Sequence, residues 1–320
     1  NKNLYCLKFF VPLPYHPMLG FMFDNNLINY FNQKFATFIL KKYSKRLNLV
    51  ELEAIVYYPM IYPVINDLKI KKIYFHIVDE WQGFSGIPKS MLNLTKKILK
   101  VSNTVIVSSQ RLYNRYKQFS NNIHLLEHGT DFEMFNEVYC NKKKNYTNNT
   151  ITSKLNVGYY GSLEKLDFEI IESVSKQLKQ WNFYFVGPLK NKNNYINRFE
   201  NGNVHFLKQV ERSKLPFFLE KIDLFWMPFK VNELTRSMLP IKIYEVMSSG
   251  LPIVSRDLEG CRSINEDLIF FFKNDKDAIE KLLLAKQSDN NVIRRKRINF
   301  VKPLTWDKRF TTFKKLINLS

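Results

Sequence analysis

The residues best suited to bind an anion are concentrated in residues 239–254, which read LPIKIYEVMSSGLPIV. A proline at the first helical position, a glycine stop and a following apolar run predict a loop, a helix over 240–249 and a strand. We expect the helix to begin at the carboxyl edge of a sheet, where free N–H groups and the helix dipole favour a diphosphate. Arg236 and Lys242 would add positive charge, and Glu245 could accept hydrogen bonds from vicinal hydroxyls such as those of a ribose. The same pattern also fits an ordinary amphipathic helix whose Glu245 faces solvent, and the segment alone leaves both interpretations open.

The elements that would position this segment form a clear alternation after residue 154. Apolar runs predict strands at 155–160, 181–186, 204–207, 223–229, 251–255 and 268–272, and helical spacing predicts helices at 167–179, 211–222 and 275–285. Continuous apolar strands separated by helices are typical of a parallel sheet covered on both faces.

The first half of the chain shows the same alternation less cleanly. We expect strands at 53–58, 72–78 and 104–108 and helices at 31–46 and 89–100. The opening stretch is broken by prolines, so we expect the first βα unit of this domain to be absent. The polar residues 140–154 read as a linker. The predicted organisation is an N-terminal domain over 1–145, a C-terminal domain over 154–303 and a final helix over 304–320 that returns to the N-terminal domain.

Length and composition agree with two folded domains. The 320 residues are 45% hydrophobic and 15% aromatic, which is ample for two cores and excludes a disordered chain. No apolar run is long enough to span a bilayer, and no signal peptide opens the chain. Cys6, Cys140 and Cys261 form no CxxC pair and read as free thiols in a reducing compartment, so we expect a cytoplasmic protein.

The formal net charge of +20 favours anionic partners, although lysines scattered over solvated faces would give the same total. Only 142–144 and 294–297 are dense basic runs. We predict reversible, salt-sensitive contact with an anionic membrane through the N-terminal domain, where apolar and basic residues mix. Those residues are Phe9, Phe10, Lys41, Lys42 and Lys45. A soluble enzyme with a water-soluble acceptor is the alternative. Nucleic acid is not an expected partner, because no basic face interleaved with exposed aromatics is apparent.

The spacing Pro240, Lys242, Glu245, Gly250 and Pro252 resembles the signature of the large retaining glycosyltransferase family of bacterial surface polysaccharide assembly. An Asp-Glu pair after a strand, Asp79 and Glu80, is similar to the teichuronic-acid type of this family-4-like group. Further matching stretches occur in family order from residue 55 to residue 310. They are 107–109, 128–131, 158–162, 185–188, 204–210 and 223–229. The ordered set, rather than any single motif, carries the resemblance.

The resemblance implies a fold and a set of roles. The fold would be α/β with two Rossmann-like domains facing a central cleft, the GT-B architecture, with the nucleotide sugar bound by the C-terminal domain. Glu245 would bind the ribose, and Gln209 and Val210 would lie against the nucleobase, although these two could simply mark a strand exit. Asp79 and Glu80 would be catalytic or acceptor-side residues, unless they are a helix cap or loop feature. The full predicted donor-binding set is Gly161, Ser162, Lys165, Gln209, Val210, Arg236, Ser237, Lys242 and Glu245.

Two departures from the family pattern bear on activity. The family often places a second glutamate where this chain has Ser237, and the stretch after residue 160 offers only Lys165 in place of an Arg/Lys pair. These departures, with the expected missing N-terminal unit, motivate an alternative function as a non-catalytic or degenerate nucleotide-sugar-binding subunit of a larger polymerase.

We expect no metal and no cofactor besides the nucleotide-diphosphate sugar as co-substrate. Asp275 and Asp277 spell the DxD motif of metal-dependent glycosyltransferases, but Asp275 is better explained as the N-cap of a helix. The predicted activity is transfer of a sugar from the nucleotide to a saccharide or lipid-linked acceptor in surface polysaccharide synthesis, with retention and without a metal. The predicted place is the cytoplasm, at the inner face of the cell membrane.

Overall fold

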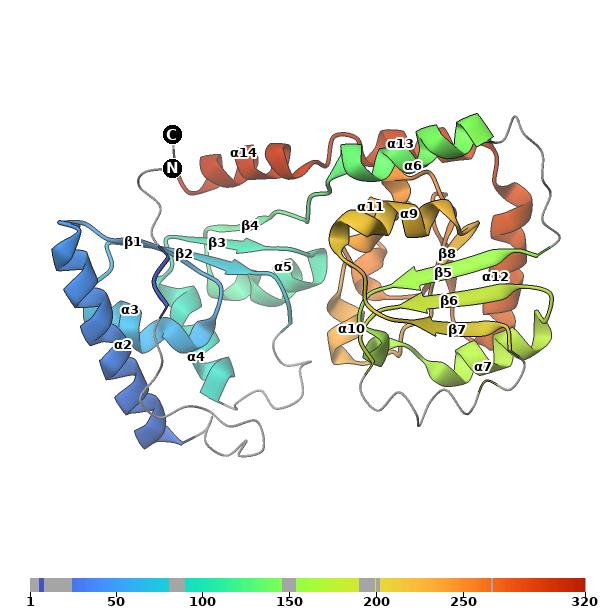
Figure 1. Ribbon diagram of the computed structural model, residues 1–320. Coiled ribbons are helices and arrows are strands. Elements are labelled where there is room, and N and C mark those ends of the chain that lie inside the picture. The colour runs from blue at the N-terminus through green and yellow to red at the C-terminus, as the bar shows by residue number, and fades with distance from the viewer. Residues whose placement is uncertain are drawn as a thin grey trace. The chain divides into compact units, whose positions relative to one another are not determined.

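The structure is a computed structural model, and it describes residues 6–8, 25–80, 90–145, 154–189, 199, 202–265 and 267–319. The chain divides into two compact units, Asn1–Leu125 and Leu126–Ser320. Each unit contains one parallel β-sheet accompanied by α-helices (Figure 1). The predicted α/β fold class with two Rossmann-like domains is confirmed.

Unit 1 has a four-stranded sheet in the order β1-β2-β3-β4, and every pairing is parallel. The two central strands are the most buried, with Phe75, Ile77 and Val105 excluded from solvent. The strands are β1 (Glu53–Val56), β2 (Lys72–Ile77), β3 (Thr104–Val107) and β4 (Ile123–Leu125). The helices are α2 (Asn26–Arg46), α3 (Tyr62–Leu68), α4 (Ser90–Val101) and α5 (Gln110–Tyr116), with short 3₁₀ turns at Pro59–Ile61 and Lys117–Phe119.

Local sequence explains where the helices of unit 1 begin. Asn25 caps α2 by accepting from the N–H groups of Leu27 and Ile28, and Ser109 caps α5 by accepting from that of Leu112. The predicted helix at 31–46 therefore starts earlier, at Asn26, because the capping asparagine precedes the apolar pattern.

Unit 2 has a six-stranded parallel sheet in the order β10-β9-β8-β5-β6-β7. Strands β5 to β8 of this sheet are labelled in Figure 1. The strands are β5 (Asn156–Tyr160), β6 (Asn182–Val186), β7 (Val204–Leu207), β8 (Leu224–Met227), β9 (Ile253–Arg256) and β10 (Phe270–Phe272). The helices are α6 (Phe132–Asn145), α7 (Phe168–Gln177), α9 (Leu215–Glu220), α10 (Glu233–Ser237), α11 (Lys242–Ser248), α12 (Asp275–Ser288), α13 (Asn291–Val301) and α14 (Trp306–Leu316). All six predicted strands of this half are present.

The strand order of unit 2 creates a topological switch point between β5 and β8. The chain runs outward from β5 through β6 to β7, then crosses to β8 on the other side of β5 and continues to β9 and β10. In open α/β sheets, ligands bind beyond the carboxyl ends of the strands at such a point. The ends concerned are Tyr160 of β5 and Met227 of β8.

The division between the units differs from the predicted boundary at 145–154. It falls between Leu125 and Leu126, because α6 packs on α9 and α11 and so belongs to unit 2. Residues 140–145, expected to be linker, form the last turns of α6. The final helix exists as α14, and its return to the N-terminal domain stays a prediction.

The dense basic run at 294–297 lies in α13, which was not predicted as a helix. Arg297 is fully buried, and its guanidinium donates to the carbonyls of Leu268 and Gly250 and pairs with Asp289 at 2.7 Å. At least this cation is used inside the fold and contributes nothing to a surface patch.

Candidate functional site

The candidate site begins where β5 ends, at Gly161. This glycine has a φ of +132°, and a β-carbon at this position would lie 2.6 Å from the Nζ atom of Lys242. The backbone conformation therefore favours glycine here, and a side chain would displace the lysine ammonium. The Lys242 side chain thus reaches the end of β5, next to the switch point of the sheet.

The Lys242 ammonium is held by aromatic groups. Its Nζ atom lies 3.4 Å from the hydroxyl of Tyr159, 5.0 Å from the centroid of that ring and 5.8 Å from the ring centroid of Phe229. The Tyr159 hydroxyl in turn donates to the carbonyl of Ser162 at 3.2 Å. These contacts fix the ammonium by cation–π attraction and one hydrogen bond, and they do not neutralise it.

Charge and burial make this ammonium suited to bind an anion. Burial first, and then the nearby charge of Lys165, lower the pKa of Lys242 to about 8, while the Glu245 carboxylate opposes both. In the described part of the chain, no carboxylate lies within ion-pair distance of Lys242. An anion near the two lysines would relieve their repulsion and raise the pKa of Lys242 again.

Glu245 follows Lys242 by three residues in α11 and is 1% exposed. The Tyr160 hydroxyl donates to its Oε2 atom at 2.5 Å, and the guanidinium of Arg212 lies 2.7 Å from its Oε1 atom. Arg212 also pairs with Asp131 at 2.6 Å. Burial and the Glu245 carboxylate raise the pKa of Tyr160 well above its ordinary value, so this hydroxyl remains a donor. Glu245 does not face solvent, which excludes the ordinary amphipathic-helix interpretation.

The backbone at the start of α11 differs from the prediction. The helix begins at Lys242 rather than residue 240, and Ile241 provides no side-chain cap. The N–H groups of Ile243 and Tyr244 already donate to the carbonyls of Pro240 and Ile241. The main-chain donors expected to hold a diphosphate are thus partly used.

The other predicted donor residues are placed less tightly. The Lys165 ammonium lies 3.6 Å from the Met238 sulfur. Arg236 is an exposed residue of α10, and the side chain of Ser237 lies outside the described atoms. Gln209 and Val210 are exposed in the segment after β7, which ends at the same edge of the sheet as β5. The structure thus brings Gly161, Ser162, Lys165, Lys242 and Glu245 to one edge.

Asp79 and Glu80 follow β2 of unit 1, at the carboxyl end of that strand. Glu80 is 1% exposed, and its carboxylate pairs with Arg115 at 2.9 Å and accepts a hydrogen bond from the Tyr116 hydroxyl. These contacts favour a structural role for Glu80 within unit 1. The acceptor-side role of the pair stays a prediction.

Four residues of the site were given no role from the sequence, although three of them lie in the matching stretches 128–131 and 158–162. They are Tyr159, Tyr160, Asp131 and Arg212. Adjacent side chains on a strand point to opposite faces, and the hydroxyls of Tyr159 and Tyr160 reach Lys242 and Glu245 respectively. A pair of tyrosines at a strand end, just before a glycine, was the available signal.

The DxD sequence serves to begin a helix. Asn274, not Asp275 as predicted, is the N-cap of α12, because its side chain accepts from the N–H of Asp277. Asp275 accepts from the Ser173 hydroxyl at 2.6 Å, and Asp277 accepts from the N–H of Lys273. Within the described ranges, no group of three or more His, Cys, Asp or Glu residues is placed to hold a metal ion.

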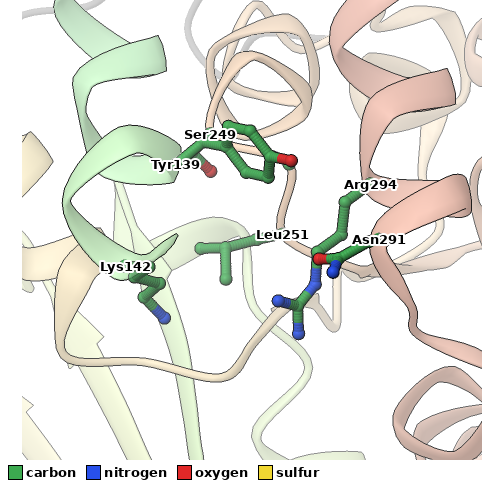
Figure 2. Close-up of a pocket in the computed structure, with 7 residues that line it drawn as sticks. Tyr139, Lys142, Ser249, Leu251, Asn291 and Arg294 are labelled. Carbon is green, nitrogen blue, oxygen red and sulfur yellow. The ribbon is translucent and has the colours of Figure 1, made fainter. Parts of the chain in front are cut away.

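A small hollow of about 20 Å³ elsewhere in unit 2 lies between α6, α13 and the segment before β9 (Figure 2). It could hold no more than a single water molecule. Its basic groups are engaged: Lys142 donates to the carbonyl of Ile222, and Arg294 pairs with Asp289 at 2.7 Å. Because β9 starts here, the hollow is at the amino edge of the sheet, away from the candidate site.

Among the described residues, none of the helices is both long and apolar enough to cross a membrane.

Comparison with known proteins gives a family match within unit 2. Residues 155–286 match the family Glycosyl transferases group 1, a range that holds Gly161, Lys165, Arg212, Lys242 and Glu245. No curated protein matches the chain significantly.

Solved structures resemble both units. Sucrose-phosphate synthase from Thermosynechococcus elongatus has a TM-score of 0.70 at 15% identity, covering 96% of this chain and 80% of that chain. HepE from Anabaena in complex with UDP has a TM-score of 0.64 at 14% identity. The match covers 81% of this chain and 75% of HepE. A third similar structure is a UDP-forming trehalose-phosphate synthase from Burkholderia xenovorans in complex with glucose-6-phosphate, with a TM-score of 0.67 at 12% identity. The match covers 94% of this chain and 81% of the synthase. At such identities the likeness shows the fold, which is GT-B.

Proposed function

We propose that this protein is a glycosyltransferase that binds a nucleotide-diphosphate sugar at the carboxyl edge of the unit 2 sheet. The observation that carries the proposal is the Lys242 ammonium, buried against Gly161 near a second lysine and without a carboxylate partner in the described chain. Keeping a buried ammonium charged is costly, and a bound anion would offset that cost. The match to glycosyl transferases group 1 over 155–286 and the UDP in the HepE structure support a nucleoside diphosphate as that anion.

The chemical role of the lysines follows from the charge that develops in the reaction. When the bond between the sugar and the diphosphate breaks, negative charge grows on the leaving phosphate. Lys242 and Lys165 would stabilise that charge from fixed positions, and this stabilisation needs no reorganisation of solvent. Glu245 would accept hydrogen bonds from the ribose hydroxyls, with Tyr160 and Arg212 holding its carboxylate in place.

The finer features of the proposal rest on the resemblance and the charge. The acceptor is a saccharide or a lipid-linked saccharide of bacterial surface polysaccharide, transfer proceeds with retention, and no metal takes part. The reaction occurs in the cytoplasm at the inner face of the membrane. The UDP-forming synthase with bound glucose-6-phosphate supports a sugar acceptor in this fold.

The experiment that tests the proposal is a thermal-shift screen against UDP-, GDP- and TDP-sugars. A ligand present at one hundred times its Kd adds about 2.7 kcal/mol of stability, so the correct nucleotide raises the Tm measurably. We expect one nucleotide class to raise the Tm of the wild-type protein and not that of Lys242→Met. If no nucleotide sugar raises the Tm, the proposed donor site is wrong. Nucleotide binding without any sugar transfer or nucleotide-sugar hydrolysis would favour the non-catalytic subunit instead.

A further inference from the structure

The carboxylate proposed to bind the ribose is covered in this structure. The side chain of Glu245 is 1% exposed, whereas that of its partner Arg212 is 47% exposed. The guanidinium therefore lies between a buried carboxylate and solvent. A ribose hydroxyl that approaches Glu245 from the solvent side meets this guanidinium first.

The contact that covers Glu245 is close but poorly aligned. The Nη2 atom of Arg212 lies 2.7 Å from Oε1 of Glu245, yet within the described chain this oxygen accepts no hydrogen bond. The other oxygen, Oε2, accepts from the Tyr160 hydroxyl at 2.5 Å. Buried polar atoms nearly always have a hydrogen-bond partner, so Oε1 lacks a donor that it could still gain. Its contact with Arg212 is mainly electrostatic.

Arg212 is also held by groups other than Glu245. Its Nη2 and Nε atoms donate to Oδ2 of Asp131 at 2.6 Å and 3.2 Å, and its guanidinium lies 5.6 Å from the ring centroid of Phe135. Asp131 is 43% exposed and so lies toward solvent. A small rotation of the guanidinium can therefore break the contact with Glu245 and keep those with Asp131 and Phe135.

The segment that carries Arg212 can follow such a rotation. Every residue from 208 to 214 is exposed, between the end of β7 and the start of α9. The short 3₁₀ turn Arg212–Lys214 has no side-chain cap from Glu211, the residue before it. Exposed segments with little packing are among the least stable parts of a fold. Movement of Arg212 thus requires no change in the sheet or in α11.

We propose that Arg212 is a gate over the ribose-binding carboxylate of the donor site. In the free protein its guanidinium covers Glu245 and holds it in place. When a nucleoside diphosphate binds, the guanidinium turns toward Asp131, and a ribose hydroxyl donates to Oε1 of Glu245 in its stead. Tyr160 holds Oε2 in both states. The inference rests on the proposed function, because it assigns a step to the binding of the same nucleotide.

A gate and a purely structural arginine predict opposite effects on binding. A gate lowers the association rate and the affinity by the fraction of molecules that are open, so its removal increases both. An arginine that only positions Glu245 would, on removal, leave the carboxylate misplaced and weaken binding. Loss of a cation also slows the association of an anionic ligand by electrostatics alone. Faster association after removal of Arg212 is therefore specific to the gate.

Surface plasmon resonance on the immobilised full chain, with UDP, GDP and TDP as probes, measures these rates. We expect Arg212→Met to raise the association rate constant about tenfold, as for a gate that is closed in about nine molecules of ten. Lys214→Met is the matched control, because it removes an exposed cation from the same 3₁₀ turn. The control is expected to leave association unchanged or slightly slower. An association rate constant of Arg212→Met no higher than that of the wild-type protein overturns the gate.

Asp131→Asn tests the open position and leaves Glu245 with its cation. Without Asp131, the arginine has lost the carboxylate toward which it turns, so we expect association to slow about threefold. Electrostatics alone predicts the reverse, since loss of a negative charge favours an anionic ligand. Association as fast as that of the wild-type protein, or faster, overturns the role of Asp131 and with it the gate.

Failure of the gate and failure of the donor site give different results. If none of the three nucleotides binds either the wild-type protein or Arg212→Met, the donor site proposed in unit 2 is wrong and the gate is overturned with it. If one nucleotide binds both proteins with the same association rate constant, the donor site stands and only the gate is overturned.

Discussion

The Nη2 atom of Arg212 lies 2.7 Å from Oε1 of Glu245 and 2.6 Å from Oδ2 of Asp131, so one guanidinium joins two carboxylates. The two differ in environment: the side chain of Glu245 is 1% exposed and that of Asp131 is 43% exposed. The buried carboxylate depends on Arg212 for its neutralisation, whereas the exposed one is already solvated.

This asymmetry predicts unequal effects on stability. Arg212→Met leaves the buried Glu245 without its cation and is expected to lower the free energy of unfolding by about 1–3 kcal/mol. Asp131→Asn removes only the exposed partner of Arg212 and is expected to change the free energy of unfolding by less than about 1 kcal/mol. Urea denaturation of both variants measures the difference. Equal losses would show that Glu245 does not rely on this ion pair.

Glu245→Gln is expected to weaken binding of a nucleoside diphosphate by roughly tenfold to a hundredfold, because hydrogen bonds to a charged group contribute about 1.5–3 kcal/mol. The control experiment changes the ligand instead of the protein. With a 2′-deoxynucleotide the effect of the substitution is expected to shrink, since the hydroxyl that would donate to Glu245 is missing. If the loss is the same for both ligands, as measured by calorimetry, Glu245 does not contact the ribose 2′-hydroxyl.

The pKa of Lys242, lowered by burial to about 8, predicts two pH dependences. Between pH 8 and its unfolded value near 10.5, the folded protein has lost a proton that the unfolded chain keeps, so this group makes stability rise with pH in that window. Nucleotide-sugar affinity should fall as pH rises through 8, because the ammonium that attracts the diphosphate is lost. Lys242→Arg keeps its charge and is the control. If the nucleotide-sugar affinity of the wild-type protein changes with pH no more than that of Lys242→Arg between pH 7 and pH 9, Lys242 is not the anion-binding group.

Removal of divalent metal ions is expected to leave transferase activity intact. Asp275 and Asp277, the pair that could suggest a metal, are engaged in starting α12. Activity measured with and without EDTA tests this. Abolition by EDTA with rescue by magnesium or manganese would contradict a metal-free mechanism.

The alternation of strands and helices was predictable because buried strands and amphipathic helices each have a characteristic pattern of apolar residues. The strands of unit 2 lie within a residue or two of their expected positions. The spacing also singled out the segment around Lys242 and Glu245, although it left the role of that segment open. The unit boundary was not predictable in the same way. Polar residues at 140–145 suggested a linker, yet they complete α6, whose other residues Phe135 and Val138 are buried in the unit 2 core.

The partners of the site residues could not be predicted because they come from distant parts of the chain. Arg212 contacts Glu245 and Asp131 only once β7, α6 and α11 are packed together. The three residues are far apart in the chain, so the spacing of neighbouring residues could not predict this contact. The exposure of Leu27, Phe31 and Phe38 on α2 could likewise not be predicted, since the alternation of Phe and Lys does not reveal which side of a helix is buried. Phe9 and Phe10, predicted to take part in membrane contact, lie outside the described residues, whereas Lys41, Lys42 and Lys45 are exposed.

Calorimetric titration of the wild-type protein and Lys242→Met with UDP tests the central claim most directly, with GDP and TDP titrated in parallel. Methionine keeps most of the side-chain volume and removes a buried charge, so the variant is expected to fold with an unchanged or higher Tm. We predict that one nucleotide binds the wild-type protein and binds the folded variant at least tenfold more weakly, as loss of a charge-assisted contact requires. Equal affinity for the two folded proteins would contradict the assignment of this lysine, and with it the proposed nucleotide-sugar site.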